Sequence, residues 1–176
     1  MEIKHLIVGP LLTNCYVLIS GNEAIVIDPG GEIEKILKEI EGKKLTYIIL
    51  THYHRDHTLA APRLKKEKGG KILIGKGEKE FIDFPVDEFL NEKEEIRIGN
   101  EFLKVISTPG HTKGSICLLG KDFIFTGDTL FADGVGRTDL PGGSEKDLEK
   151  SLKKLKKIIK PKMKIFPGHG PIFEKK

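Results

Sequence analysis

Residues 51–57, which read T-H-Y-H-R-D-H, place three histidines and one aspartate close together in the chain. Neutral imidazole is the commonest protein ligand of a transition metal, and a carboxylate is its usual oxygen partner. In an extended segment, side chains two residues apart, such as His52 and His54, project to the same side. The alternative is a polar loop that happens to be rich in histidine, although a random match to this motif somewhere in the chain has a chance of only roughly a few in ten thousand. The segment therefore predicts a metal site with His52, His54, Asp56 and His57 as ligands.

Three further ligand-type residues follow short apolar runs that have the pattern of buried strands. His111 and His169 each come after a Pro-Gly pair, and Asp128 comes after the run F-I-F-T-G. In α/β sheets, sites are built at the edge where the carboxyl ends of the strands meet. Because residues 51–57 also follow such a run, we expect all four segments to converge. Asp28 ends another apolar run and either hydrogen-bonds its own turn or supports the site from behind.

Four motifs occur in a fixed order along the chain: H-x-H-x-D-H, P-G-H-T, T-G-D-T and P-G-H-G. In this order they resemble the metallo-β-lactamase fold superfamily, and the resemblance extends over residues 14–171. The short chain and residues 134–139, which read G-V-G-R-T-D, are similar to the glyoxalase II-like (hydroxyacylglutathione hydrolase-like) hydrolases. The resemblance implies an α/β fold, a four-layer α-β-β-α sandwich.

The resemblance also implies a site for two divalent metal ions. One ion would be held by His52, His54 and His111, the second by Asp56, His57 and His169, and Asp128 would bridge the two. Three nitrogen or oxygen ligands per ion leave an open position, as a catalytic site requires. Zinc is the expected metal, while iron and manganese suit the same ligands.

A hydroxide that bridges two metal ions could attack a carbonyl group near neutral pH. Asp128, as the bridge, and Asp56, which could also aim the hydroxide, are therefore the candidate catalytic residues. A small thioester demands least of such a site, because a thiolate leaves without being protonated. By resemblance, Asp28 supports the ligands and Arg137 contacts the substrate, since arginine suits carboxylate recognition. The alternative for Arg137 is an exposed arginine in a loop.

Other activities of the same superfamily remain alternatives. A non-haem iron persulfide dioxygenase would use one iron with two histidines and one carboxylate, and would not need Asp56, His57 and His169. A phosphodiesterase or nuclease of the superfamily would carry extra domains or long insertions. One common class of lactamases has cysteine at the position of Asp128. A purely structural metal site would be expected to use cysteine ligands.

A chain of 176 residues is long enough for one well-packed domain, which we expect to span residues 1–176. Glyoxalase II carries a further C-terminal helical domain that grips glutathione. This chain ends seven residues after His169, so we expect no such domain and leave the natural thioester open.

The net charge is +4, and the basic residues gather at positions 150–164. Charge runs of this kind usually form a solvated helix face, so a nucleic-acid partner is not expected. Cys15 and Cys117 lie in apolar runs and are expected to be reduced core thiols. No segment reaches the length of a membrane span, and the N-terminus does not have the pattern of a signal peptide. The cytoplasm is therefore the expected location, and the oligomeric state is not readable.

Hydrophobic periodicity and turn residues predict the elements that position the site. Strands are expected at 2–9, 13–20, 23–28, 45–50, 71–74, 91–98, 101–106, 115–119, 122–125 and 163–166. Helices are expected at 32–41, 58–68, 76–84 and 145–159, with Ser144 as the cap of the last one. A glycine-rich loop at 129–143 is expected to lie beside the site.

Overall fold

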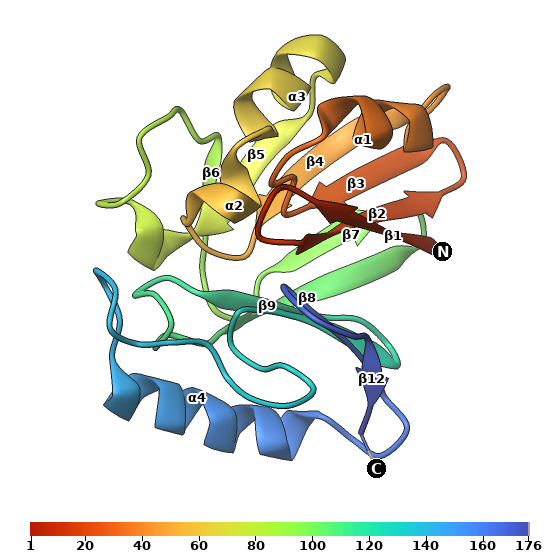
Figure 1. Ribbon diagram of the computed structural model, residues 1–176. Helices are drawn as coiled ribbons and strands as arrows, with labels where there is room; N and C mark the ends of the chain where they lie inside the picture. The colour runs from red at the N-terminus through yellow and green to blue at the C-terminus, as the bar shows by residue number, and fades with distance from the viewer. Residues whose placement is uncertain (176) are drawn as a thin grey trace.

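The apolar runs of the chain form two mixed sheets of six strands each in the computed structural model, which describes residues 1–175 (Figure 1). The first sheet follows the chain order, from one edge to the other: β1 (Glu2–Val8), β2 (Thr13–Ser20), β3 (Glu23–Ile27), β4 (Lys44–Leu50), β5 (Lys71–Gly75) and β6 (Glu88–Leu90). The second sheet also keeps neighbours in chain order: β7 (Glu95–Ile98), β8 (Glu101–Ser107), β9 (Ile116–Leu119), β10 (Phe123–Gly127), β11 (Lys164–Pro167) and β12 (Phe173–Glu174).

Parallel pairing in both sheets brings several strand ends to one edge. Strands β3, β4, β5 and β6 pair in parallel, as do β10 and β11, while the remaining neighbours are antiparallel. Parallel neighbours need crossover connections. The helices α1 (Ile33–Glu39), α3 (Ala61–Lys68) and α4 (Glu145–Ile158) supply three of them. The carboxyl ends of β4, β10 and β11 thereby carry three of the four ligand motifs.

Three apolar layers hold the four layers of secondary structure together, as the resemblance predicted. One packs α1 and α3 against the first sheet, for example Ile36 and Leu64 against Ile48. A second fills the space between the sheets. The third packs α4 against the second sheet through Leu155. Figure 1 shows α1 and α3 on one side of the sheets and α4 on the other. The α-β-β-α sandwich is confirmed.

Several element boundaries differ from the sequence prediction. The helix predicted over 58–68 begins at Ala61 as α3, and a separate turn of helix that was not predicted, α2 (Arg55–Thr58), lies within the ligand segment. The helix predicted at 76–84 is only a 3₁₀ turn, η1 (Lys76–Glu78). The strand expected at 91–98 begins at Glu95, and the short edge strands β6 and β12 were not predicted.

The last helix follows its prediction closely. The Ser144 hydroxyl caps α4 by accepting a hydrogen bond from the Asp147 amide at 3.2 Å. The buried side chains Leu148, Ser151 and Leu155 recur on one face, and the lysines occupy the solvated face. No helix within residues 1–175 is long and apolar enough to cross a membrane.

Candidate metal centre

Ring nitrogens of His52, His54 and His111 lie close together. His52 and His54 follow β4 of the first sheet, and His111 follows β8 of the second. One ligand atom from each of the three lies within 4.8 Å of the others. Nε2 of His111 and Nδ1 of His54 are 3.0 Å apart. Zinc–nitrogen bonds of about 2.0–2.1 Å at tetrahedral angles separate ligand atoms by about 3.3 Å. The three histidines therefore have the composition of one metal site, and His54 and His111 have the spacing of two of its ligands.

Asp56, His57 and His169 form a second group with nearly equal sides. Oδ2 of Asp56 lies 3.2 Å from Nε2 of His57 and 3.2 Å from Nε2 of His169. The two imidazole nitrogens are also 3.2 Å apart. These separations match a tetrahedral set of nitrogen and oxygen ligands. The hydroxyl of Thr13 donates a hydrogen bond to Oδ2 of Asp56 at 3.0 Å and so helps to hold this carboxylate in place.

Asp128 lies between the two groups and faces both. Its Oδ2 is 3.5 Å from Nε2 of His111 and 3.9 Å from Nε2 of His52. The same oxygen is 3.5 Å from Nε2 of His169, and Oδ1 is 3.3 Å from Nε2 of His57. The structure thus brings all seven predicted ligands together, and it places Asp128 where a bridging carboxylate would be.

Three atoms of this cluster test whether a cation fits. Nε2 of His52, Nε2 of His54 and Oδ1 of Asp128 are buried and have no hydrogen-bond partner within residues 1–175. Buried polar atoms are normally satisfied, and a lone pair without a donor is most readily satisfied by a cation. The set of imidazole and carboxylate ligands suits a divalent transition metal. The residues present therefore fit divalent metal ions.

Hydrogen bonds from outside the cluster fix how three of the imidazoles point. Nδ1 of His111 donates to the Arg137 carbonyl at 2.7 Å, and Nδ1 of His169 donates to the Leu11 carbonyl at 3.1 Å. A carbonyl oxygen can only accept, so Nδ1 carries the proton in both rings. In the neutral form of each ring, Nε2 then directs a lone pair into the cluster, as a metal ligand must.

Asp28 supports the imidazole of His57. This is one of the two roles that the sequence analysis considered for Asp28, the other being a hydrogen bond within its own turn. Its Oδ2 accepts from Nδ1 of His57 at 2.9 Å and from the Thr51 hydroxyl at 2.7 Å, while Oδ1 accepts from the Thr51 amide at 2.7 Å. Asp28 has a φ of 52°, in the left-handed region that aspartate tolerates better than most residues. The carboxylate is directed at the ligand segment.

Two histidines of the first group, His52 and His54, are neutral. Burial lowers the pKa of His52 well below its ordinary value, and neighbouring His57 adds to the effect. Burial and the neighbouring His111 lower the pKa of His54 to about 4. At neutral pH both rings therefore carry free lone pairs without giving up a proton.

The second group holds protons in the metal-free protein. Burial would lower the pKa of His57, but Asp128 and Asp28 raise it well above its ordinary value. Burial also opposes the charge on His169, yet hydrogen bonds with Asp128 and Asp56 raise its pKa to about 9. Burial would raise the pKa of Asp128, but the neighbouring His57 keeps it well below the usual range. A metal ion bound here would displace these protons.

Glycines let the ligand loops approach one another. A Cβ atom at Gly30 would lie 1.5 Å from the Asp56 carbonyl oxygen. A Cβ at Gly168 would lie 2.1 Å from Oδ1 of Asp128 and 2.8 Å from Cε1 of His57. Contacts this short exclude any side chain. The Pro-Gly pair before His169 is therefore needed for the geometry of the site as well as for the turn.

Arg137 stands apart from the other predicted site residues. Its guanidinium is largely exposed and pairs with Asp139 at 2.6 and 2.7 Å. This ion pair raises the pKa of Arg137 above its ordinary value. What reaches the cluster is its backbone carbonyl, through His111. A contact between the Arg137 side chain and a substrate stays a prediction.

Sequence reasoning missed two residues that touch the ligand segments. Thr13 begins β2, and nothing in its neighbourhood marks it as a partner of Asp56. Glu78 is fully buried and accepts hydrogen bonds from backbone amides on two ligand loops. Burial raises the pKa of Glu78, and hydrogen bonds from Thr112, Gly114 and Tyr53 act against that rise. No motif around Glu78 predicts these contacts, because its partners are backbone amides.

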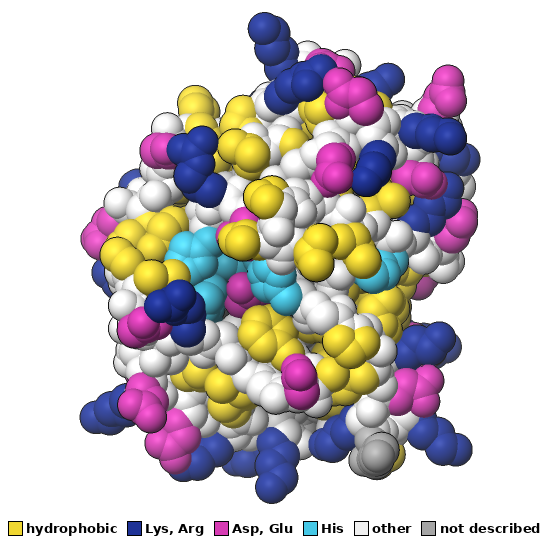
Figure 2. All heavy atoms as spheres, viewed as in Figure 1, with side chains coloured by type: hydrophobic (Ala, Val, Ile, Leu, Met, Phe, Trp, Pro, Cys, Tyr) yellow, Lys and Arg dark blue, Asp and Glu magenta, His cyan; other side chains and the backbone are white. Residues whose placement is uncertain are grey.

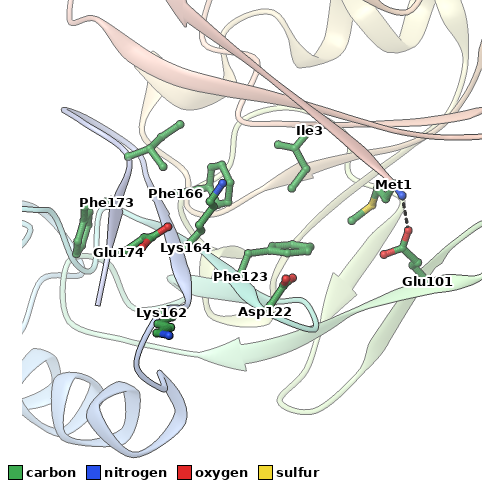
Figure 3. Close-up of a pocket in the computed structure, with 11 residues that line it drawn as sticks. Met1, Ile3, Glu101, Asp122, Phe123, Lys162, Lys164, Phe166, Phe173 and Glu174 are labelled. Atoms are coloured by element: carbon green, nitrogen blue, oxygen red, sulfur yellow. Dashed lines mark ion pairs between the residues drawn. The ribbon is translucent and has the colours of Figure 1, made fainter. Parts of the chain in front are cut away.

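A cavity of about 670 Å³ lies away from this cluster (Figure 3). Ile3, Phe123 and Phe166 line it together with charged residues such as Glu101 and Lys164. None of the seven candidate ligands is among the residues that line it. This cavity is therefore separate from the candidate metal centre.

The sequence model of the metallo-beta-lactamase superfamily matches residues 8–169, a span that contains all seven candidate ligands. This chain belongs to the metallo-beta-lactamase superfamily. The probable polyketide biosynthesis zinc-dependent hydrolase PksB of Bacillus subtilis is 35% identical over 89% of this chain and 72% of its own length. The probable metallo-hydrolase YqgX of the same species is 32% identical over 97% and 91%.

Solved structures of the superfamily agree with the fold over nearly the whole chain. The BLEG-1 B3 metallo-beta-lactamase superposes with a TM-score of 0.91 at 28% identity, covering 98% of this chain and 94% of that one. ETHE1 from Myxococcus xanthus gives 0.88 at 26% identity, covering 99% and 80%. TTHA1623 in a di-iron-bound form gives 0.86 at 30% identity, covering 97% and 94%. Members of the superfamily related to this chain are thus described with zinc and with iron.

Proposed function

We propose that this metallo-beta-lactamase superfamily member is a binuclear metal-dependent hydrolase that cleaves a small thioester. The observation that carries the proposal is the pair of ligand groups that share Asp128, each with three nitrogen or oxygen donors. Divalent ions bound there would lower the pKa of a water molecule and polarise a carbonyl oxygen. We infer zinc as the metal, in line with the zinc-dependent hydrolase among the relatives.

The residues around the cluster support hydrolysis without a side-chain nucleophile. Cys15 and Cys117 are fully buried, and burial raises the pKa of both thiols above the ordinary value. Neither thiol is therefore available as a thiolate near neutral pH. Asp56 is partly exposed and held by Thr13, so its carboxylate can accept a hydrogen bond from an attacking water molecule. A thioester fits best because its thiolate leaves without a proton donor.

We infer an apolar part of the substrate from exposed apolar side chains on segments next to the ligands, here called the apolar rim. We define this rim as Leu11, Leu12, Leu59 and Val135, whose side chains are 63%, 66%, 55% and 45% exposed. Leu11, whose carbonyl accepts a hydrogen bond from His169, and Leu12 lie in the turn between β1 and β2. Leu59 follows His57 by two residues, and Val135 lies in the loop after Asp128.

Figure 2 shows histidine side chains reaching the surface among hydrophobic ones. Full burial of one such leucine side chain against a bound substrate would contribute about 1.5–3 kcal/mol of binding free energy. We therefore propose a thioester with an apolar acyl or thiol group and no nucleic-acid partner.

The test is metal analysis combined with a thioester assay on the same sample. Protein purified without added metal is analysed for its elements, and hydrolysis of an acyl thioester is followed by release of the free thiol. We expect about two metal ions per chain and turnover that Asp128→Ala abolishes. Asp122→Ala, at an exposed turn, is the matched control and should retain activity.

Other outcomes identify a different activity. One iron per chain, no thioester turnover and oxygen uptake with a persulfide would replace the hydrolase by a dioxygenase. Two metal ions with cleavage of a phosphodiester and none of a thioester would keep the metal centre and overturn the substrate class. Both results are read from the same preparation.

A further inference from the structure

Glu78 is a carboxylate buried outside the metal centre that no ligand role accounts for. It ends η1, the 3₁₀ turn after β5, and its side chain is completely buried. Oε2 accepts a hydrogen bond from the Tyr53 amide at 2.9 Å, and Oε1 accepts one from the Gly114 amide. A buried carboxylate is costly unless it is fully hydrogen-bonded, so both amides are essential partners.

The two partners belong to the two loops that carry the first ligand group. Tyr53 stands between His52 and His54 and follows β4 of the first sheet. Gly114 comes three residues after His111 and leads into β9 of the second sheet. One carboxylate thus ties together the segments that must bring their imidazoles to one point.

The backbones of η1 and of the loop after His111 pack closely at the contact made by Glu78, which we call the junction. A Cβ atom at Gly77 would lie 2.7 Å from Cα of Gly114, and one at Gly114 would lie 2.4 Å from N of Glu78. A Cβ at Gly75 would lie 2.0 Å from the Gly114 carbonyl oxygen. Glycines on both sides therefore let η1 and the loop after His111 touch through their backbones.

A carboxylate is the side chain that this junction requires. It offers acceptors to two amide donors at once, whereas glutamine of the same shape would turn an NH₂ group toward one of them. An unpaired buried amide costs about 1–3 kcal/mol, so the loops would shift to relieve it. A shift of either loop changes the separation of His54 from His111, which are now 3.0 Å apart through their ring nitrogens.

We propose that Glu78 is a positioning residue for the metal site formed by His52, His54 and His111, holding the two ligand loops at the spacing that this site requires. The second group, Asp56, His57 and His169, has its own supports in Thr13, Asp28 and Leu11. Loss of Glu78 therefore weakens one site and spares the other. The proposal rests on metal binding alone and is independent of the substrate.

The test measures Zn²⁺ affinity site by site, by competition with a chromophoric chelator. Glu78→Gln is made in two backgrounds: His169→Ala, which leaves the first ligand group intact, and His54→Ala, which leaves the second. In the His169→Ala background we expect the affinity to fall about 10–100-fold, as for loss of an outer-shell partner. In the His54→Ala background the change should stay within about twofold, as for independent sites.

Asp87→Asn is the matched control, because Asp87 also accepts a backbone amide, that of Ile72 at 2.7 Å, but touches no ligand loop. It should leave both affinities unchanged. Equal weakening of both sites by Glu78→Gln, or no weakening of the first, would overturn the proposal and leave Glu78 as a support of the fold.

Amide exchange in the metal-free protein gives a second readout. If Glu78→Gln does not fold, Glu78→Asp keeps the charge on a shorter arm and takes its place. We expect faster hydrogen exchange at the Tyr53 and Gly114 amides and unchanged exchange at Ile72. Unchanged exchange at Tyr53 and Gly114 would contradict the assigned contacts.

Discussion

The carboxylate of Asp28 lies 2.9 Å from Nδ1 of His57 and fixes the orientation of this imidazole. The other ring nitrogen of His57, Nε2, faces Asp128. The same carboxylate accepts both the amide and the hydroxyl of Thr51, the residue that opens the ligand segment. Asp28 therefore sets the orientation of one ligand and the starting position of the others. Such outer partners of ligating histidines also raise their basicity.

Asp28→Asn should weaken metal binding without disturbing the backbone, because asparagine also tolerates the left-handed φ of 52°. The neutral amide loses the charge that supports His57. We expect Zn²⁺ affinity of the group formed by Asp56, His57 and His169 to fall about 10–100-fold. Chelator competition measures it in the His54→Ala background. Asp122→Asn, at an exposed turn, is the control. An unchanged affinity in Asp28→Asn would show that Asp28 does not support His57 as a metal ligand.

Gly168→Ala should damage the metal centre by a direct clash. The added Cβ would lie 2.1 Å from Oδ1 of Asp128 and 2.8 Å from Cε1 of His57, so both side chains must move. We expect loss of the second metal ion from the purified protein, measured by elemental analysis. Gly134→Ala, where an added Cβ meets nothing within 4 Å, should retain two ions. Two ions in Gly168→Ala would show that the loop can shift freely.

The ligand set could be predicted because each ligand follows a strand, and strand ends are set by local apolar patterns. The convergence of Asp128 and His169, for example, follows from the parallel pairing of β10 with β11. Glu78 was not predictable in this way, since its partners Tyr53 and Gly114 are 25 and 36 residues away and contribute only backbone amides. Nothing in a side-chain pattern marks such partners.

The errors in the fold have similar causes. Strand β6 has three residues, with one side chain fully buried, so it is defined by its pairing with β5 more than by its own periodicity. The helix expected at 76–84 stops after one turn, at Glu78, whose side chain is drawn to the ligand loops. For Arg137 the partner is close in sequence: its guanidinium donates hydrogen bonds to the carboxylate of Asp139, two residues away.

The apolar rim should affect substrate binding more than the chemical step. Leu12→Ser removes an exposed apolar side chain next to Thr13, which holds Asp56. For a thioester with an apolar acyl group we expect KM to rise about 3–10-fold with little change in kcat, since only part of the leucine is buried by a ligand. Phe102→Ser, at an exposed site near the start of β8, should change neither constant. A fall in kcat alone would contradict a binding role.

Cys117 should make the protein less stable in alkali. Burial raises the pKa of this thiol from 9.0 to about 11, so above pH 9 the unfolded chain releases the proton first. Stability from this group is complete below pH 9 and is lost as the pH rises toward 11, by roughly 2–3 kcal/mol. Denaturant unfolding at pH 8 and pH 11 measures the loss. Cys117→Ala should reduce this pH-dependent difference, and an identical difference in both proteins would show that other groups cause it.

Metal affinity should rise with pH across the neutral range. The pKa of His169 is raised to about 9, so below pH 9 a binding metal ion must displace its proton, and His57 holds one as well. Each displaced proton changes the apparent affinity about tenfold per pH unit. Chelator competition at pH 6.5, 7.5 and 8.5 in the His54→Ala background measures the slope. In the His169→Ala background burial lowers the pKa of His52 and His54, so these two of the three remaining ligands are already neutral and the slope should be shallower. Equal slopes in both backgrounds would show that the protons are not held by His57 and His169.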